Sequence, residues 1–152
     1  MPAWIVITAE DLANYSVGEK ITALRQEALD QNQGDPFTAV MPEVAAEARG
    51  YLSRGGQNQL SETANSVPPE AKRSFVWLVI QAMQTRLPGL SFSDEEKAAI
   101  EDAHRWFERV ADGKIAISVP EDPVTPQVQA GGAIAVVSAP TRVFTSTALN
   151  GI

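Results

Sequence analysis

The sequence predicts a mainly α fold, a small bundle of about five helices with a short C-terminal strand and an extended, partly β C-terminal arm. Two observations carry this prediction. Through most of residues 9–112, apolar residues recur every three or four positions, as they do on one face of a helix. Beyond residue 119 that pattern gives way to prolines and small residues, and residues 120–152 hold only Glu121, Asp122 and Arg142 as charged side chains.

The first two predicted helices are short and amphipathic. Thr8 and Asp11 have the spacing of a capping box, which predicts a helix from about residue 9 to residue 15, before Gly18. The following segment, EKITALRQEALDQ, has helical apolar spacing and predicts a second helix over residues 19–31. The residues expected on its buried face are Ile21, Leu24, Ala28 and Leu29.

The third predicted helix begins at a clear start signal. Asp35 is a preferred N-cap residue, and Pro36 has the fixed φ that suits the first helical position. Gly55 and Gly56 are expected to end this helix. The polar segment 57–66 predicts a loop with at most one turn of structure. The residues expected on the buried face of the helix are Phe37, Val40, Met41, Val44, Ala48, Tyr51 and Leu52.

The fourth predicted helix is the central one, and the fifth is predicted to bury one face. Residues 75–80, FVWLVI, are apolar on every side, which is typical of a central, buried helix. Ser93 and Glu96 form a capping box for the fifth helix, and the acids at 94–96 favour its positive end. We expect Trp106 to widen the buried face of this helix, which consists of Ile100, Ala103, Phe107 and Val110.

The sequence changes character at Gly113, a natural residue for a helix end. Residues 114–119, KIAISV, alternate with period two and predict a short strand. The prolines of PEDPVTP then prevent continued regular structure. These changes divide the chain into a helical core over 1–119 and an arm over 120–152. Since its apolar residues are too sparse to form a core, the arm either folds back onto the helices or reaches another molecule. We expect it to be mobile in the free subunit and to order on a partner.

The sequence predicts no catalytic, cofactor or metal site. The chain has no cysteine and one histidine, His104, whereas nucleophilic and transition-metal sites need several convergent groups. The acids at 94–96 are explained as helix-capping groups. A net charge of −7 repels phosphate and disfavours tight duplex binding. Neither a secretion signal nor an apolar run of membrane-spanning length is visible, so a cytoplasmic product is expected.

The residues expected to contact partners lie near the two ends of the chain. Trp4 is a large aromatic close to the N-terminus, and it either contacts a partner or packs onto the protein's own helices. In the arm, residues 134–137 or 142–145 are expected to pair as strands, with Phe144 as the main apolar contact. The complete set is Trp4, Ile134, Val136, Val137, Arg142, Val143, Phe144 and Leu149.

Five stretches of the sequence resemble the Mu-like phage head–tail adaptor proteins. The resemblance touches most of the chain, although each motif is short. After Tyr51 this chain departs from the family's usual continuation, because Gly55 and Gly56 lead into a loop rich in Gln and Asn. The stretches are ITAEDLANY (7–15), AEARGYLSRG (46–55), VPPEAKR (67–73), IEDAHRWFERVADGKIAIS (100–118) and RVFTSTALNGI (142–152).

The resemblance implies a structural virion protein that lies at the head–tail junction and is in the host cytoplasm during assembly. It implies a homo-oligomeric ring, a dodecamer by analogy, that binds the portal protein above and a stopper or terminator protein below. Genomic DNA would pass through the lumen without sequence-specific binding, and no membrane would be involved. One alternative is a stopper or tail-terminator ring at the same junction, although such proteins are expected to be richer in β-structure. Another is a DNA-packaging or regulatory helical module, which would bind duplex DNA with a steep salt dependence.

Overall fold

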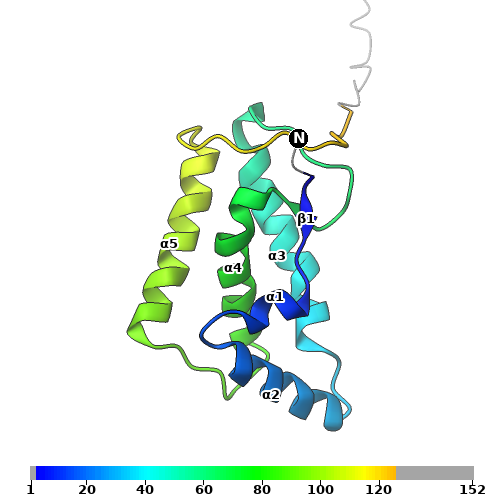
Figure 1. Cartoon of the computed structure of the whole chain (residues 1–152), viewed down its shortest axis with the longest axis vertical. Helices are drawn as coiled ribbons and strands as arrows, with labels where there is room; N and C mark the ends of the chain where they lie inside the picture. Colours follow the sequence, from blue (N-terminus) through cyan, green and yellow to red (C-terminus); the bar gives the residue numbers. More distant parts are fainter. Residues whose placement is uncertain (1–2, 126–152) are drawn as a thin grey trace, which may run out of the picture.

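The computed structural model describes residues 3–125 of the 152-residue chain, and it is mainly helical, as the sequence predicts (Figure 1). Within these residues there are five α-helices, one pair of two-residue strands and two short 3₁₀ turns, at Arg54–Gly56 and Pro69–Ala71. The helices and strands are β1 (Ile5–Val6), α1 (Ala9–Ala13), α2 (Gly18–Asp30), α3 (Pro36–Ser53), β2 (Ser66–Val67), α4 (Lys72–Gln84) and α5 (Asp94–Ala111).

Helix α4 lies at the centre of the molecule. It packs against α3 and α5, and α1 covers part of it (Figure 1). Because helices surround α4 on several sides, the run from Phe75 to Ile80 is buried throughout, which confirms the prediction for this segment. Helix α2 packs at the edge of this arrangement, against α1 and α3.

The predicted helix starts are confirmed by hydrogen bonds. The Asp35 carboxylate accepts from the Phe37 backbone N–H at 3.0 Å, and Pro36 occupies the first helical position of α3. The Arg25 guanidinium also pairs with Asp35, with Nη2 to Oδ2 at 2.6 Å, so the same carboxylate joins α2 to α3. At α5, Ser93 and Glu96 exchange side-chain and backbone hydrogen bonds, as a capping box requires.

The predicted buried faces are confirmed for α5 and only partly for α2 and α3. Ile100, Ala103, Phe107 and Val110 of α5 are all buried. In α3, Phe37 and Tyr51 are half-buried rather than fully enclosed. In α2 the prediction for Leu29 is wrong, since its exposed fraction is 45%. At about 100° per residue, Leu29 lies about 140° around the helix axis from Leu24. This angle is too wide for both side chains to be buried in a helix that is covered on one side only.

Helix α5 ends just before Gly113, as predicted, and Gly113 has a φ of +74°. The Gly113 N–H donates to the Val110 carbonyl at 3.0 Å, and the Lys114 N–H donates to the Arg109 carbonyl at 2.8 Å. These two bonds are the Schellman arrangement, which satisfies carbonyls at a helix end. The positive φ favours glycine at this position, whereas the nearby Gln57 Oε1, 2.5 Å from a Cβ built on Gly113, belongs to an exposed side chain that can move away.

The β-structure differs from the prediction in its location. The expected strand over 114–119 is not formed; this segment crosses one end of the bundle without pairing to another strand. Its period-two pattern reflects Ile115 and Ile117, which pack half-buried against the core. The sheet instead pairs β1 with β2 in antiparallel register, Ile5 opposite Val67. Strand β2 begins inside the stretch expected to be a loop, and two residues are too few to produce an alternating pattern.

Candidate functional site

Three segments that are distant in sequence meet at one end of the bundle, around Arg49 of α3. Its guanidinium donates to three backbone carbonyls of the loop between α3 and α4: Nη2 to Ser61 O at 2.5 Å, Nη1 to Ser66 O at 3.0 Å and Nη1 to Thr63 O at 3.3 Å. The same guanidinium lies over the Trp4 ring, 5.8 Å from the ring centre, a distance suited to a cation–π contact. We call the contacts among Trp4, Arg49, residues 61–66 and residues 118–124 the Arg49 junction.

Asp122 fixes the start of the arm to this junction. Its carboxylate accepts from Ser61 Oγ at 2.6 Å and from Thr63 Oγ1 at 2.7 Å. The Ser61 and Thr63 hydrogen bonds stabilise the charged form, so the pKa of Asp122 lies below its usual value. On either side of Pro123, the backbone also pairs: Glu62 N–H donates to Asp122 O, and Val124 N–H donates to Leu60 O, both at 2.7 Å. The described chain therefore ends in a firmly positioned segment.

Trp4 joins the N-terminal segment to the same junction. Its indole Nε1–H donates to the Ser118 carbonyl at 3.0 Å, and the residue is 8% exposed. The Ser118 hydroxyl in turn donates to Glu70, just before α4. Of the two alternatives for Trp4, the structure thus supports packing onto the protein's own chain. The other expected contact residues lie outside the described residues; they are Ile134, Val136, Val137, Arg142, Val143, Phe144 and Leu149.

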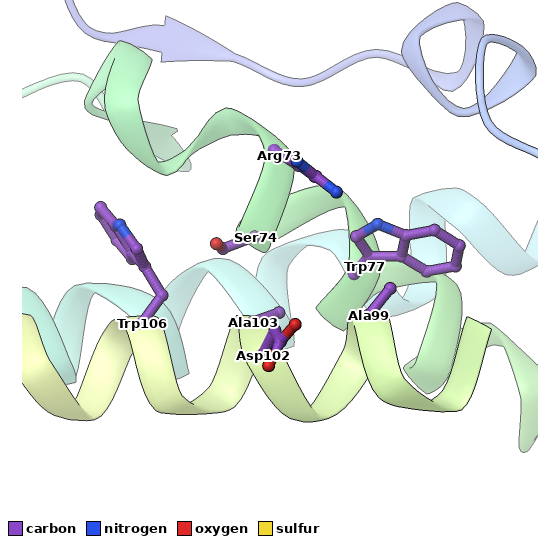
Figure 2. A pocket seen from close by; sticks show the side chains of 7 residues that line it. All are labelled: Arg73, Ser74, Trp77, Ala99, Asp102, Ala103 and Trp106. Atoms are coloured by element: carbon purple, nitrogen blue, oxygen red, sulfur yellow. The ribbon is translucent and has the colours of Figure 1, made fainter. Parts of the chain in front are cut away.

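A groove of about 230 Å³ lies between α4 and α5 (Figure 2). The indoles of Trp77 and Trp106 stand at its two ends, and Ala99 and Ala103 of α5 leave space between them. The Trp77 ring is held edge-on against Tyr15, at 5.5 Å between ring centres, so this wall of the groove is preformed. Trp106 stands edge-on to Phe107 at 5.0 Å and is half-buried, which leaves part of its indole open to the groove.

The rim of this groove carries one cation and one anion. Arg73 extends from α4, and Asp102 lies on α5 (Figure 2). Asp102 also accepts from Arg105 at 3.1 Å, one turn further along α5, but that pair is largely exposed and contributes little. The groove therefore combines aromatic and small apolar surface with opposite charges on its two sides.

The other chemically notable side chains have local structural partners. His104 Nε2 lies 2.7 Å from Gln81 Oε1, a contact that links α5 to α4. Glu96 accepts from Ser16 Oγ at 2.8 Å as well as from Ser93, and the Ser93 backbone hydrogen bond lowers the pKa of Glu96. Between residues 3 and 125 there is no cluster of three His, Cys, Asp or Glu side chains arranged to hold a metal ion. No helix in that range has the length and apolarity to cross a membrane.

The Arg49 junction was not predicted from the sequence, although the sequence contains one signal for it. Arg49 follows Ala45 by four residues and precedes Leu52 by three, which places a charge on the buried face of α3. A charge in such a position must find polar partners. Asp122 gives no comparable signal, since it lies among prolines where no periodicity applies.

The chain matches no protein-family model, no curated protein and no solved structure.

Proposed function

We propose that the protein is a head–tail adaptor of a tailed-phage virion. In this role it forms a ring beneath the portal, lets DNA pass through the lumen and offers a docking surface to tail-proximal proteins. The proposal starts from the five sequence stretches that resemble the Mu-like adaptors. The observation that carries it furthest is that the four stretches within residues 3–125 contact one another in the folded chain.

Each of those contacts joins two of the resembling stretches. Lys72 Nζ lies 2.7 Å from Asp11 Oδ1, which joins VPPEAKR to ITAEDLANY. The ring centres of Tyr51 and Phe107 are 6.1 Å apart, which joins AEARGYLSRG to the α5 stretch. The Ser118 hydroxyl donates to Glu70 and so joins the α5 stretch to VPPEAKR. Motifs spread over more than a hundred residues thus form one structural unit, as expected if they derive from a common fold.

The charge distribution also favours a channel protein over a DNA-binding protein. Of the 12 bases and 19 acids in the chain, only Arg142 lies beyond residue 125, so residues 3–125 carry a net charge of −8. A surface of this sign repels DNA phosphates and allows a duplex to pass nearby without sticking. The mainly helical fold favours an adaptor over a stopper or tail-terminator ring, for which more β-structure is expected.

Reconstitution with the portal protein of the same phage tests the proposal directly. The purified full-length chain should add a ring of density beneath the portal in negative-stain images. A chain that leaves portal particles unchanged at saturating concentration would overturn the adaptor assignment. The matched control is a variant lacking residues 126–152, which retains Asp122 and the rest of the Arg49 junction. We expect that variant to fold, as judged by circular dichroism, and to bind the portal poorly.

Fluorescence anisotropy with labelled duplex DNA separates the adaptor from the regulatory or packaging alternative. We expect no tight sequence-selective binding at physiological salt, because residues 3–125 are strongly acidic. Nanomolar affinity for one sequence, weakening steeply with added salt, would favour a regulatory module instead. A random duplex of equal length is the control.

A further inference from the structure

We propose that the groove between α4 and α5 binds the C-terminal segment of a neighbouring copy of this chain. Phe144 of that copy enters between the indoles of Trp77 and Trp106, and its Arg142 lies beside Asp102. This inference rests on the proposed function in one respect, because a ring supplies the neighbouring copy. It adds the receptor site for the arm, which the sequence alone does not locate.

The size and chemistry of the groove point to a side chain rather than a small molecule. Its volume of about 230 Å³ falls below the range of roughly 300–1,000 Å³ that is usual for small-molecule sites. Two indoles at its ends offer edge and face contacts to a third aromatic ring, and such pairs add to the stabilisation from burial alone. The alanines at 99 and 103 provide the space that a ring would fill.

The sequence beyond residue 125 supplies a matching occupant. Residues 126–152 contain no acid and a single base, Arg142, which is followed directly by Val143 and Phe144. Residues 126–152 therefore carry a net charge of +1, whereas residues 3–125 carry a net charge of −8. Arg73 on the α4 side repels Arg142, which therefore lies on the α5 side, where Asp102 accepts from Arg105 through Oδ1 and offers Oδ2 to Arg142.

The arm starts at a fixed point and is long enough to reach a neighbouring copy, which the proposed ring supplies. In Figure 1 the described chain ends on the right, above β1, whereas α5 lies at the left edge of the molecule. The Arg49 junction holds this end in place through Asp122. An arm of one copy that enters the groove of the next gives a head-to-tail contact, the type that forms rings when the rotation closes. The 19 residues from Thr125 to Phe144 span at most about 63–68 Å, enough to reach an adjacent copy.

Tryptophan quenching of a bimane label tests the contact in the full-length chain. The chain has no cysteine, so Ser146→Cys provides one labelling site next to Phe144. Labelled copies that also carry Trp106→Phe are mixed with an excess of unlabelled copies. We expect quenching when the unlabelled copies contain Trp106, and its loss when they carry Trp106→Phe. A label at Ser91→Cys, in the exposed connection before α5, is the matched control and should not respond.

Two results would overturn the inference. One is the absence of Trp106-dependent quenching at every concentration. The other comes from a labelled chain that keeps Trp106: quenching in that chain that does not change on dilution would place the arm in its own groove. Circular dichroism of the Trp106→Phe chain shows whether the helices are retained, so misfolding is recognised separately. Portal binding without this quenching contradicts the groove assignment alone, and quenching without portal binding contradicts the adaptor assignment alone.

A second variant checks the role of the aromatic ring. Phe144→Ala should weaken self-association by about tenfold or more, since an aromatic side chain at the centre of a contact often dominates its energy. Thr147→Ala lies on the same segment and should change self-association by less than about twofold. Analytical ultracentrifugation measures both. Equal effects of the two substitutions would mean that Phe144 is not the residue that enters the groove.

Discussion

The α3–α4–α5 bundle and the Arg49 junction at its end are held together by different forces. In the bundle, Phe75, Phe107 and their apolar neighbours are fully buried, and the stabilisation is spread over many contacts without direction. In the junction, one guanidinium and one carboxylate connect three segments through hydrogen bonds of defined geometry. The comparison shows that the bundle supplies most of the stability, whereas the junction decides where the chain leaves the molecule.

The largest expected effect comes from a cavity in the bundle. Phe107→Ala should lower the free energy of unfolding by about 3–5 kcal/mol, because the side chain is completely buried and a cavity adds to the lost transfer energy. Urea unfolding followed by circular dichroism measures this change. Glu108→Ala, on the exposed face of the same helix, should stay within about 0.5 kcal/mol. A loss below about 1 kcal/mol for Phe107→Ala would contradict the burial of Phe107.

Removal of Arg49 tests the junction and should have a smaller effect. Arg49→Met should cost about 2–3 kcal/mol, because the carbonyls of Ser61 and Ser66 lose their donor in a partly buried setting. Arg49→Lys keeps the charge but not the forked donors, so it should recover only part of this loss. Arg54→Met, an exposed position one turn later, is the control. Equal unfolding energies for Arg49→Met and the control would show that water replaces the guanidinium without loss.

A single cap in the bundle should have a smaller effect again. Ser93→Ala removes the side chain that accepts from the Glu96 N–H and should cost about 1 kcal/mol. Ser91→Ala removes a hydroxyl that contacts only the exposed Lys20 amine, and little change is expected there. If thermal unfolding ranks the two variants in the opposite order, the capping box does not define the start of α5.

Acid should loosen the junction before the bundle. The hydrogen bonds from Ser61 and Thr63 lower the pKa of Asp122 below its ordinary 3.8, so the attached state binds its proton more weakly than the detached state. The attachment is therefore fully present at pH values above the ordinary pKa of 3.8, and it is lost as the pH falls through the lowered pKa of the attached Asp122. We expect amide protection at Val124 to decrease there while protection at Phe107 persists. Asp122→Asn should remove this pH dependence, and a parallel decrease at both amides would mean that no separate opening occurs.

How much the sequence could predict follows from the same comparison. The face of α5 and the Asp35 cap were predictable, because each depends on residues within one or two helical turns. The alternation of Ile115 and Ile117 correctly indicates that one side of residues 114–119 is buried. It does not tell whether another strand or the helix bundle covers that side. The Arg49 junction joins residues that are up to 114 positions apart, and no local pattern reports such pairings.

The groove escaped prediction for a related reason. Trp77 and Trp106 both lie on the apolar faces of their helices, and both were predicted to be core residues. Trp77 is 7% exposed and agrees with that reading, whereas Trp106 is half-buried beside open space. Periodicity identifies which face of a helix is apolar, but the packing of the helices decides whether that face is filled. A groove wall and a core residue therefore look alike in the sequence.

The hydrogen bond between Trp4 and Ser118 has a consequence for the time course of synthesis. The indole is translated early, and its carbonyl acceptor follows 114 residues later. At a translation rate of about 5–20 residues per second, the interval is roughly 6–23 s. Throughout that interval the nascent chain presents an aromatic ring without its final partner. Closure of this end is thus set by the pace of the ribosome, whereas α3 and α4 are both synthesised before Ser118.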